Sequence, residues 1–335
     1  MPLPSRNSVR NAGKRIALSA SIEHADPSDI ALVDAWRKSH LKPLSAVSMW
    51  LRKPAQAATG LPPAQRLKRR NTVLDKLISG RASDASTMHD LGGCRLIFPD
   101  TDKLQRFRTY LEKESRARHM LLHDRSKYDY ILSPKPTGYR GVHYVYGYRS
   151  SSSNNSELEG LKVELQLRTE TQHAWATAVE IADLVLRART KFEDGTGTYG
   201  EFFRLSSEIL ARSVEGVTSC LPELGSNELK ERFEQEESSH TLLDRLDKLK
   251  EQGDLSKIKQ HTILAFKEDD TLEIFGYTKA ARAIEKEGEL LLNPDYVHVV
   301  YVPSSTPASI RNSYRNYLTN PADYVKLMKG GLQKI

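Results

Sequence analysis

The sequence predicts a chain of the α/β or α+β class with a second, smaller α+β domain at its C-terminal end. Over residues 64–190, short apolar segments of strand composition alternate with amphipathic segments of helical spacing. After residue 256 the pattern changes to two short strands around a polar turn, followed by a helix, a strand and short helices. The composition, 39% hydrophobic and 28% charged, is typical of a folded globular chain.

The N-terminal quarter of the chain predicts helices. Residues 28–53 place Ile30, Val33 and Trp36 at helical spacing, and the segment PAQAATGLPP then predicts a loop. A second helix is predicted over residues 64–79, where several cations on one helix can hold a triphosphate. A solvated basic helix has the same composition. The cations of this segment are Arg66, Lys68, Arg69, Arg70 and Lys76.

The central part of the chain predicts the strands of a sheet. Strand composition is found in CRLIF, KYDYIL, VHYVYGY and LKVELQLRT. In the last of these, apolar residues alternate with Glu164, Gln166 and Arg168, so one face of the strand is buried and the other is polar. Helices are expected over residues 104–114 and from residue 171 onward.

The C-terminal part of the chain predicts helices and then a β-hairpin. Residues 200–256 have helical spacing, and HTILAFKEDDTLEIFGY has the pattern of two strands joined by a polar turn. We therefore expect a first domain over residues 1–235, a linker helix over 236–256 and a second domain over 257–335.

The cysteine and apolar contents exclude several classes of protein. Cys94 and Cys220 are too few to hold a chain of 335 residues together by disulfides or to form a zinc site alone. No apolar run approaches the roughly 18 residues of a membrane span, and the basic N-terminus lacks the long apolar region of a secretory signal. We expect a cytoplasmic protein with no zinc and no membrane partner.

The net charge of +7 is concentrated at the N-terminal end. Residues 1–80 contain 14 Lys and Arg against 5 Asp and Glu, so the rest of the chain sums to −2. This distribution favours a polyanionic partner such as a nucleic acid, or a polyphosphate substrate. A solvated surface that keeps the protein soluble explains the same charge.

Two acidic residues are candidates for a Mg²⁺ site. Asp90 precedes a Gly-Gly pair and a buried strand that holds Arg95, and a carboxylate on a rigid frame suits a hard cation. Glu164, on the polar face of its strand, can complete that site or accept the proton of an attacking hydroxyl. A role for Asp90 in a cap or turn is the alternative.

The segment PKPTGYRGVH predicts an ordered loop, because two prolines and Gly138 restrict its backbone. It is expected to present Lys135, Tyr139, Arg140 and His143 together at the mouth of one binding site. An exposed Tyr on a Gly turn can stack on a nucleobase, and the cations can meet phosphate. Packing of Tyr139 on the prolines of its own loop is the alternative.

Taken together and in this order, four motifs resemble the RelA/SpoT nucleotide pyrophosphokinase domain over about residues 60–190. The motifs are RLKRRNTVLDKL, DLGGCR, YILSPKPTGYRGVH and ELQLRT. The resemblance implies a mixed sheet flanked by helices, and transfer of the β,γ-pyrophosphate of ATP to a ribose hydroxyl with the help of Mg²⁺. It assigns the ATP phosphates to Arg66, Lys68, Lys76 and Arg95, Mg²⁺ and catalysis to Asp90 and Glu164, and the acceptor to Lys135, Tyr139, Arg140 and His143.

The overall pattern also resembles the CapRel branch of this family, a fused toxin and antitoxin. In that branch a pseudo-zinc-finger domain without zinc ligands carries a Y-x-x-Y motif that occludes the ATP site. Here Tyr314 and Tyr317 have that spacing, and no cysteine follows Cys220. The resemblance implies an autoinhibited anti-phage toxin that pyrophosphorylates the 3′-CCA end of tRNA once a phage protein, such as the major capsid protein, binds. A Tyr pair at this spacing also occurs in ordinary core packing.

The motifs leave the acceptor open. A small alarmone synthetase making (p)ppGpp or (p)ppApp from ATP and a free nucleotide would have the same catalytic residues. The N-terminal charge favours tRNA, whose candidate contacts are Lys14, Arg15, Arg52, Lys53, Arg69 and Arg70. A catalytically dead binding module is a third hypothesis, and the presence of both carboxylates together with the phosphate-binding cations argues against it.

Overall fold

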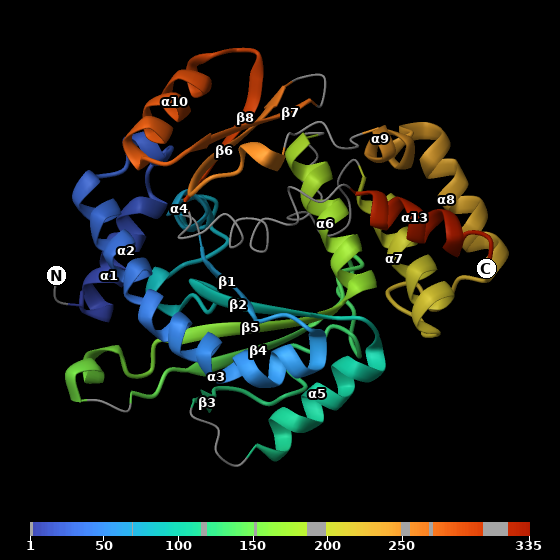
Figure 1. The fold of residues 1–335 in the computed structure, drawn as a ribbon, viewed down its shortest axis with the longest axis horizontal. Helices are drawn as coiled ribbons and strands as arrows, with labels where there is room; N and C mark the ends of the chain where they lie inside the picture. The colour runs from blue at the N-terminus through green and yellow to red at the C-terminus, as the bar shows by residue number, and fades with distance from the viewer. Residues whose placement is uncertain are drawn as a thin grey trace. The chain divides into compact units, whose positions relative to one another are not determined.

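The computed structural model describes most of the chain and divides it into two compact units. The first unit comprises Met1–Asp129 and Gly141–Arg168, and the second comprises Tyr130–Arg140 and Thr169–Ile335 (Figure 1). The domain division expected around residues 236–256 stays a prediction. The described residues are 3–68, 70–114, 119–150, 153–185, 199–248, 255–267, 271–303 and 321–335.

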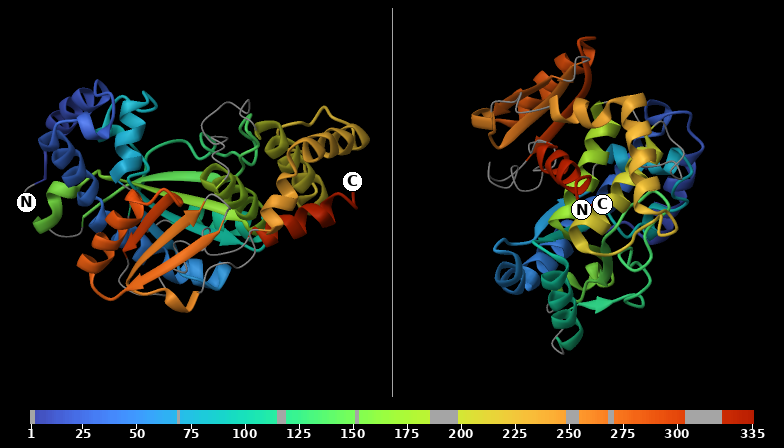
Figure 2. Two further views of the ribbon diagram at one scale, coloured as in Figure 1. Left: turned by 90° about the horizontal axis from the view of Figure 1, so that it is seen from above. Right: turned by 90° about the vertical axis from the view of Figure 1, so that its right-hand side faces the viewer.

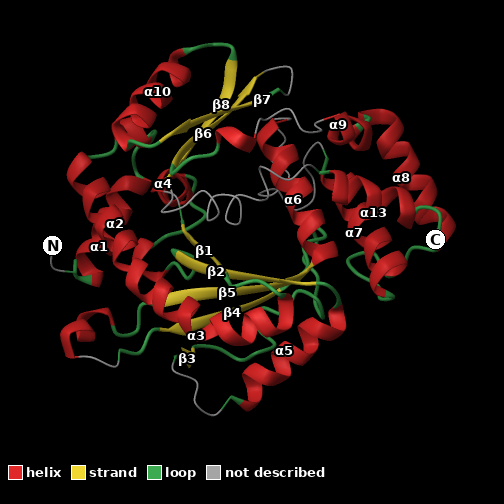
Figure 3. Ribbon diagram, viewed as in Figure 1, coloured by secondary structure: helices red, strands yellow, loops and turns green. Residues whose placement is uncertain are grey.

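The first unit contains a five-stranded mixed sheet with the strand order β1-β2-β5-β4-β3. The pairs β1–β2, β4–β5 and β3–β4 are antiparallel. Helices flank the sheet, so the predicted fold class is confirmed (Figure 3). The strands are β1 (Ala64–Leu67), β2 (Gly92–Phe98), β3 (Met120–Leu121), β4 (Val142–Gly147) and β5 (Lys162–Thr169). The helices are α1 (Arg6–Ala17), α2 (Pro27–Ser39), α3 (Leu41–Thr59), α4 (Arg70–Ile78) and α5 (Thr101–Lys113), with short 3-10 turns at Ile22–His24, Ala85–Thr87 and Ser153–Leu158.

The two faces of this sheet differ in chemistry. Along β2 and β5, buried and half-buried residues alternate, as a strand with one covered face requires. Helices α3 and α5 cover the apolar face: a Cβ at Gly92 would lie 3.5 Å from Leu44 Cβ on α3, and the rings of Phe98 and Phe107 are 5.2 Å apart. The opposite face carries the polar residues of β5.

Four local predictions are wrong. The segment PAQAATGLPP, predicted as a loop, is helical up to Thr59, because α3 continues through Pro54 and ends only at Gly60. Within the predicted helix 64–79, β1 is a strand, and helix α4 begins only at Arg70, because the backbone of β1 pairs with the edge of β2. The predicted strand over residues 127–132 is a series of turns with a single bridge from Asp129. The predicted helix 28–53 is two helices separated at His40, whose Nδ1 lies 2.9 Å from the Trp36 carbonyl and closes the end of α2.

The second unit is built around a helical core. The side chains of Trp175, Phe203 and Phe233 are buried in one apolar cluster, and those of Tyr324 and Met328 join it from the C-terminal helix. The last ten-residue helix is therefore part of the core. The helices are α6 (Glu170–Val185), α7 (Gly200–Glu215), α8 (Ser226–His240), α9 (Leu242–Lys248) and α13 (Ala322–Gly331), with a short turn at Leu255–Lys257.

The second unit also contains a three-stranded antiparallel sheet with the order β7-β6-β8. Its strands are β6 (His261–Lys267), β7 (Leu272–Tyr277) and β8 (Tyr296–Pro303), so the predicted hairpin is confirmed. Helix α10 (Ala280–Leu292) packs along one face of this sheet through Ala283 and Leu290 (Figure 2). Tyr314 and Tyr317 lie outside the described residues. None of the described helices has the length and apolar character needed to cross a membrane.

Candidate active site

The polar face of the first unit's sheet gathers several of the residues predicted for the site. On β1, Arg66 is exposed and lies opposite Gly93, so both are on the same face as Arg95 two residues further along β2. On β4 and β5, His143 lies opposite Gln166 in the same way. Asp90 lies two residues before the start of β2.

Asp90 is held by two ammonium groups from separate elements. Lys76, on α4, lies 2.9 Å from Asp90 Oδ2, and Lys68, just after β1, contacts the same oxygen. The backbone of Lys68 is fixed on both sides, because its N–H donates to the Leu91 carbonyl at 2.8 Å and its carbonyl accepts from Arg37 Nη1 at 3.0 Å. Lys68 and Asp90 are 22 residues apart in the sequence, and the pairing of β1 with β2 brings them together.

The charges of this group are set by burial and by one another. Burial alone would raise the pKa of Asp90, but Lys68 and Lys76 outweigh it and hold that pKa at about 2. Burial lowers the pKa of the Lys68 ammonium to about 8, with Asp90 acting in the opposite direction and Lys76 adding to the effect of burial. The group therefore carries one carboxylate and two cations at neutral pH, a net positive charge suited to a polyphosphate.

Glu164 is fixed by its neighbours on the polar face. His143 Nδ1 lies 2.9 Å from Glu164 Oε1, and Gln166 Nε2 donates to Oε2 at 2.6 Å. An ionised carboxylate only accepts, so Nδ1 carries the proton in this contact. Burial alone would raise the pKa of Glu164, but His143 and Gln166 outweigh it and lower that pKa. The side chain is thus a carboxylate at neutral pH, which suits a cation ligand better than a general base, whose pKa should lie near the working pH.

The donor set fits Mg²⁺. Asp90 and Glu164 are near enough that the charge of Asp90 opposes the ionisation of Glu164, as expected for two carboxylates that share a cation. Among the described residues no group of three or more His, Cys, Asp or Glu could hold a metal ion. Mg²⁺ is usually held by one or two carboxylates and by substrate phosphates, so two carboxylates beside a group of cations would be sufficient.

The second unit contains the segment Tyr130–Arg140, which holds three of the four residues predicted to bind the acceptor, Lys135, Tyr139 and Arg140, whereas His143 belongs to β4 of the first unit. In the turn of this segment, the Gly138 N–H donates to the Lys135 carbonyl at 2.8 Å, and the Lys135 N–H donates to the Tyr139 carbonyl at 3.1 Å. Gly138 has φ of +87°, a conformation that favours glycine. The ammonium group of Lys135 lies 4.6 Å from the ring centre of Tyr130 and 5.3 Å from that of Tyr139. Tyr139 is half-buried and packs against the helical core, with its ring edge-on to Tyr130 at 5.7 Å.

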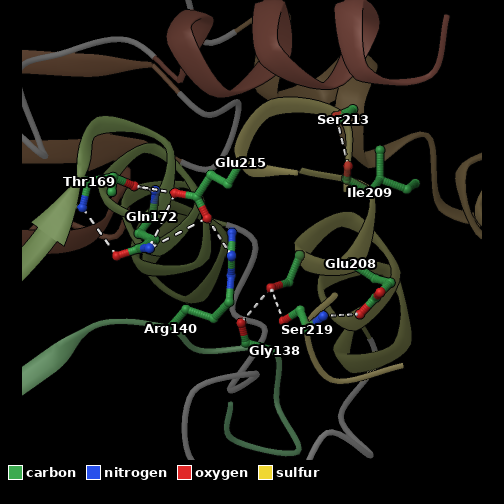
Figure 4. Close-up of polar contacts among 10 residues, drawn as sticks. Gly138, Arg140, Thr169, Gln172, Glu208, Ile209, Ser213, Glu215 and Ser219 are labelled. Carbon is green, nitrogen blue, oxygen red and sulfur yellow. Dashed lines mark hydrogen bonds and ion pairs between the residues drawn. The ribbon is translucent and has the colours of Figure 1, made fainter. Parts of the chain in front are cut away.

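Arg140 is buried rather than presented at the mouth of this loop. Its side chain is 4% exposed and forms an ion pair with Glu215 at the end of α7, itself 5% exposed. The same carboxylate accepts hydrogen bonds from Thr169 Oγ1 and Gln172 Nε2, as Figure 4 shows. The sequence analysis did not identify Glu215, because nothing in the spacing of α7 relates it to a loop 75 residues earlier.

Comparison with known families identifies the central segment. Residues 65–184, a little over a third of the chain, match the family model RelA_SpoT, described as a region found in RelA / SpoT proteins. Residues 65–184 are a RelA/SpoT region. This identifies the chain as an enzyme, a pyrophosphokinase. The RelA/SpoT region contains β1 to β5, both carboxylates and the whole of the loop Tyr130–Arg140.

The chain is similar to solved structures of small alarmone synthetases and of a GTP pyrophosphokinase family protein. Small alarmone synthetase 1 from Bacillus subtilis is 24% identical, over 45% of this chain and 79% of that chain, with a TM-score of 0.37. Its complex with the product pppGpp gives 20% identity over 53% and 90%, with a TM-score of 0.42. A GTP pyrophosphokinase family protein from Streptococcus pneumoniae gives 18% over 52% and 86%, with a TM-score of 0.40. Among curated proteins, no match to the sequence is found.

The cations predicted to contact tRNA lie mostly on the N-terminal side of the RelA/SpoT region. Lys14 on α1, Arg52 and Lys53 on α3 and Arg70 on α4 are all exposed. Arg15 is also exposed but is already engaged, since its Nε and Nη2 donate to the Asp29 carboxylate at 2.8 and 2.6 Å. Arg69 lies outside the described residues.

Proposed function

We propose that the chain transfers the β,γ-pyrophosphate of ATP to a ribose hydroxyl at the 3′-CCA end of tRNA. The observation that supports pyrophosphate transfer most strongly is the group in which Lys68 and Lys76 hold Asp90 near Glu164. Such a reaction depends mainly on positioning of the reactants and on neutralisation of phosphate charge. Both requirements are met by rigidly placed cations and carboxylates.

The residues of the first unit have distinct parts in this proposal. Lys68, Lys76 and Arg66 bind the phosphates of ATP, and Arg95 supports them from β2. Asp90 and Glu164 would hold Mg²⁺, which when bound neutralises phosphate charge and makes the β-phosphorus more electrophilic. The acceptor hydroxyl attacks the β-phosphorus, the bond from that phosphorus to the oxygen bridging to the α-phosphate breaks, AMP leaves with that oxygen, and the hydroxyl proton is released to water.

The hydrogen bonds of Glu164 fix the proposed Mg²⁺ ligand in place before any substrate binds. His143 and Gln166 fix both oxygens of this carboxylate, so it stays ionised and oriented without substrate. A fixed ligand avoids reorganisation at the moment of reaction. The half-buried ring of Tyr139 and the exposed Lys135 are proposed to receive the acceptor base and its phosphate.

The choice of tRNA as acceptor rests on charge. Lys14, Arg52, Lys53 and Arg70 are exposed and form no ion pair with the described residues. A free nucleotide needs no such surface, whereas a tRNA phosphate backbone gains from each cation it meets. These residues therefore support a macromolecular polyanion over a mononucleotide.

We further propose that the C-terminal region restrains this activity until a phage protein, such as the major capsid protein, binds. The proposal depends on Tyr314 and Tyr317, at the spacing of a motif that occludes the ATP site in the CapRel branch. An unrestrained enzyme of this kind would damage its own host, because each transfer consumes ATP and blocks a tRNA end.

The acceptor is tested with γ-labelled ATP and the full chain in parallel reactions. One contains bulk tRNA, one contains the same tRNA with its 3′-CCA end removed, and one contains GDP. We expect label on intact tRNA only, weak with the wild-type chain and stronger with Tyr314→Ala and Tyr317→Ala, in which the proposed restraint is removed. Label on GDP alone would make the chain a small alarmone synthetase. If neither is labelled, the reactions are repeated with Tyr314→Ala and Tyr317→Ala, and continued absence of label on tRNA would contradict the proposal.

A further inference from the structure

The loop Tyr130–Arg140 is attached to helix α7 of the same unit by two separate contacts. At one, Arg140 forms its buried ion pair with Glu215. At the other, Ser207 Oγ donates to the Gly138 carbonyl at 2.6 Å. The two anchors are separated by two turns of α7, and both helix residues lie beyond the RelA/SpoT region, which ends at residue 184.

The backbone at Gly138 is packed too closely against its neighbours to accept a side chain. A Cβ on this residue would lie 2.9 Å from Ser207 Cβ and 3.2 Å from both the Phe203 carbonyl and the ring of Trp175. That ring is itself fixed, since its Nε1 donates to the Phe203 carbonyl at 2.9 Å. The backbone next to Tyr139 therefore rests directly on α7.

The contact at Glu215 is costly in two ways. Its carboxylate is 5% exposed, and it stands at the last residue of α7, where the helix dipole disfavours negative charge. Buried ion pairs contribute little net stability compared with apolar packing, but they fix the geometry of their partners. Thr169 and Gln172, at the start of α6, orient the same carboxylate. This arrangement is well suited to setting the position of Arg140 and of the residue before it.

We propose that Glu215 and Ser207 are positioning residues that set the place of Tyr139 and Lys135, and so control the affinity for the acceptor. This inference rests on the proposed role of the loop in acceptor binding. Neither residue touches a reacting group in this scheme. Their effect passes through Arg140 and Gly138, which leaves the binding of ATP by the first unit unaffected.

The test compares Glu215→Gln with a matched control, Glu208→Gln. Glu208 is another fully buried carboxylate of α7, but it binds Arg212 and the backbone N–H groups of Ser219 and Leu221 instead of the loop. For Glu215→Gln we expect the acceptor KM to rise by roughly tenfold, the size of a lost charged hydrogen bond, with the ATP KM unchanged. For Glu208→Gln we expect lower stability and an unchanged acceptor KM. Equal acceptor KM values in the two variants would overturn the inference.

A second measurement is independent of catalysis. Hydrogen exchange of the Gly138 and Tyr139 amides should accelerate in Glu215→Gln and in Ser207→Ala, and should stay at the wild-type rate in Glu208→Gln. If no acceptor is labelled by the wild-type chain or by its Tyr314→Ala and Tyr317→Ala variants, the proposed function fails and this exchange alone decides whether α7 positions the loop. Unchanged exchange in both loop-anchoring variants would show that it does not.

Discussion

The ammonium group of Lys76 lies 2.9 Å from Asp90 Oδ2, and this contact joins the helix after β1 to a residue two positions before β2. Together with Lys68 it gives the carboxylate two cationic neighbours and keeps its pKa at about 2. In a pyrophosphokinase the same cations can turn to the phosphates of ATP while Asp90 turns to Mg²⁺. The group is thus preassembled before substrate arrives, with one carboxylate between two cations and a net positive charge.

Replacement of Lys76 should weaken ATP binding. In Lys76→Met one of the two cations near Asp90 is lost, and we expect the ATP KM to rise about tenfold, as for a lost charged hydrogen bond. The acceptor KM should change little. Lys113→Met, at the exposed end of α5, serves as the control and should match the wild type. An ATP KM that is the same in both variants would exclude Lys76 from the ATP site.

Replacement of Tyr139 should act on the acceptor. A stacked base is worth about 1–3 kcal/mol, so Tyr139→Ala should raise the acceptor KM about tenfold or more, with the ATP KM within twofold. The control is Leu132→Ala, because Leu132 is on the same loop with 72% of its surface exposed. If the two variants have the same acceptor KM, the ring of Tyr139 serves the packing of its loop and not the acceptor.

The C-terminal helix should be needed for stability of the second unit. Met328 is fully buried in the cluster that includes Trp175, so Met328→Ala should lower the free energy of unfolding by about 2–5 kcal/mol. Urea unfolding followed by tryptophan fluorescence measures this change, with the exposed Lys326→Ala as the control. Equal stability of the two variants would contradict the placement of α13. The same packing means that deleting residues 257–335 removes core as well as any restraint, so the Tyr314 and Tyr317 variants give the cleaner test of inhibition.

The stability of the first unit should fall at mildly acid pH because of His40. Burial lowers the pKa of His40 to about 4, against 6.5 for an ordinary histidine, although its bond to the Trp36 carbonyl opposes this. The unfolded chain therefore binds the proton first, and stability is lost as the pH falls from about 6.5 to about 4, by about 3 kcal/mol. This decrease should be absent in His40→Gln and present in His24→Gln, whose histidine is exposed. The same pH dependence in both variants would assign it to other groups.

Most of the polar face of the sheet could be predicted from the sequence. Asp90 precedes β2 and Glu164 lies within β5, both strands with a clear apolar pattern, and the alternation along β5 shows which face its acid occupies. The strand β1 could not be predicted, because its composition suits a helix and only pairing with β2, about 28 residues later, makes it extended.

The burial of Arg140 also could not be predicted from the sequence. A cation beside Gly138 and Tyr139 suggests phosphate binding, and its burial depends on Glu215, which belongs to a helix far along the chain. Local pattern gives the type of side chain that a loop carries. It does not give the partner that a distant helix supplies.

The central claim is that the two carboxylates of the first unit, Asp90 and Glu164, act together in the transfer of pyrophosphate. It is tested most directly by following ATP labelled at the α- or γ-phosphate in the presence of tRNA and of GDP. We predict AMP in a one-to-one ratio with γ-labelled acceptor, no ADP, and loss of both products in Asp90→Asn and Glu164→Gln but not in the exposed control Asp102→Asn. Formation of ADP in place of AMP, or full activity in both carboxylate variants, would contradict the account.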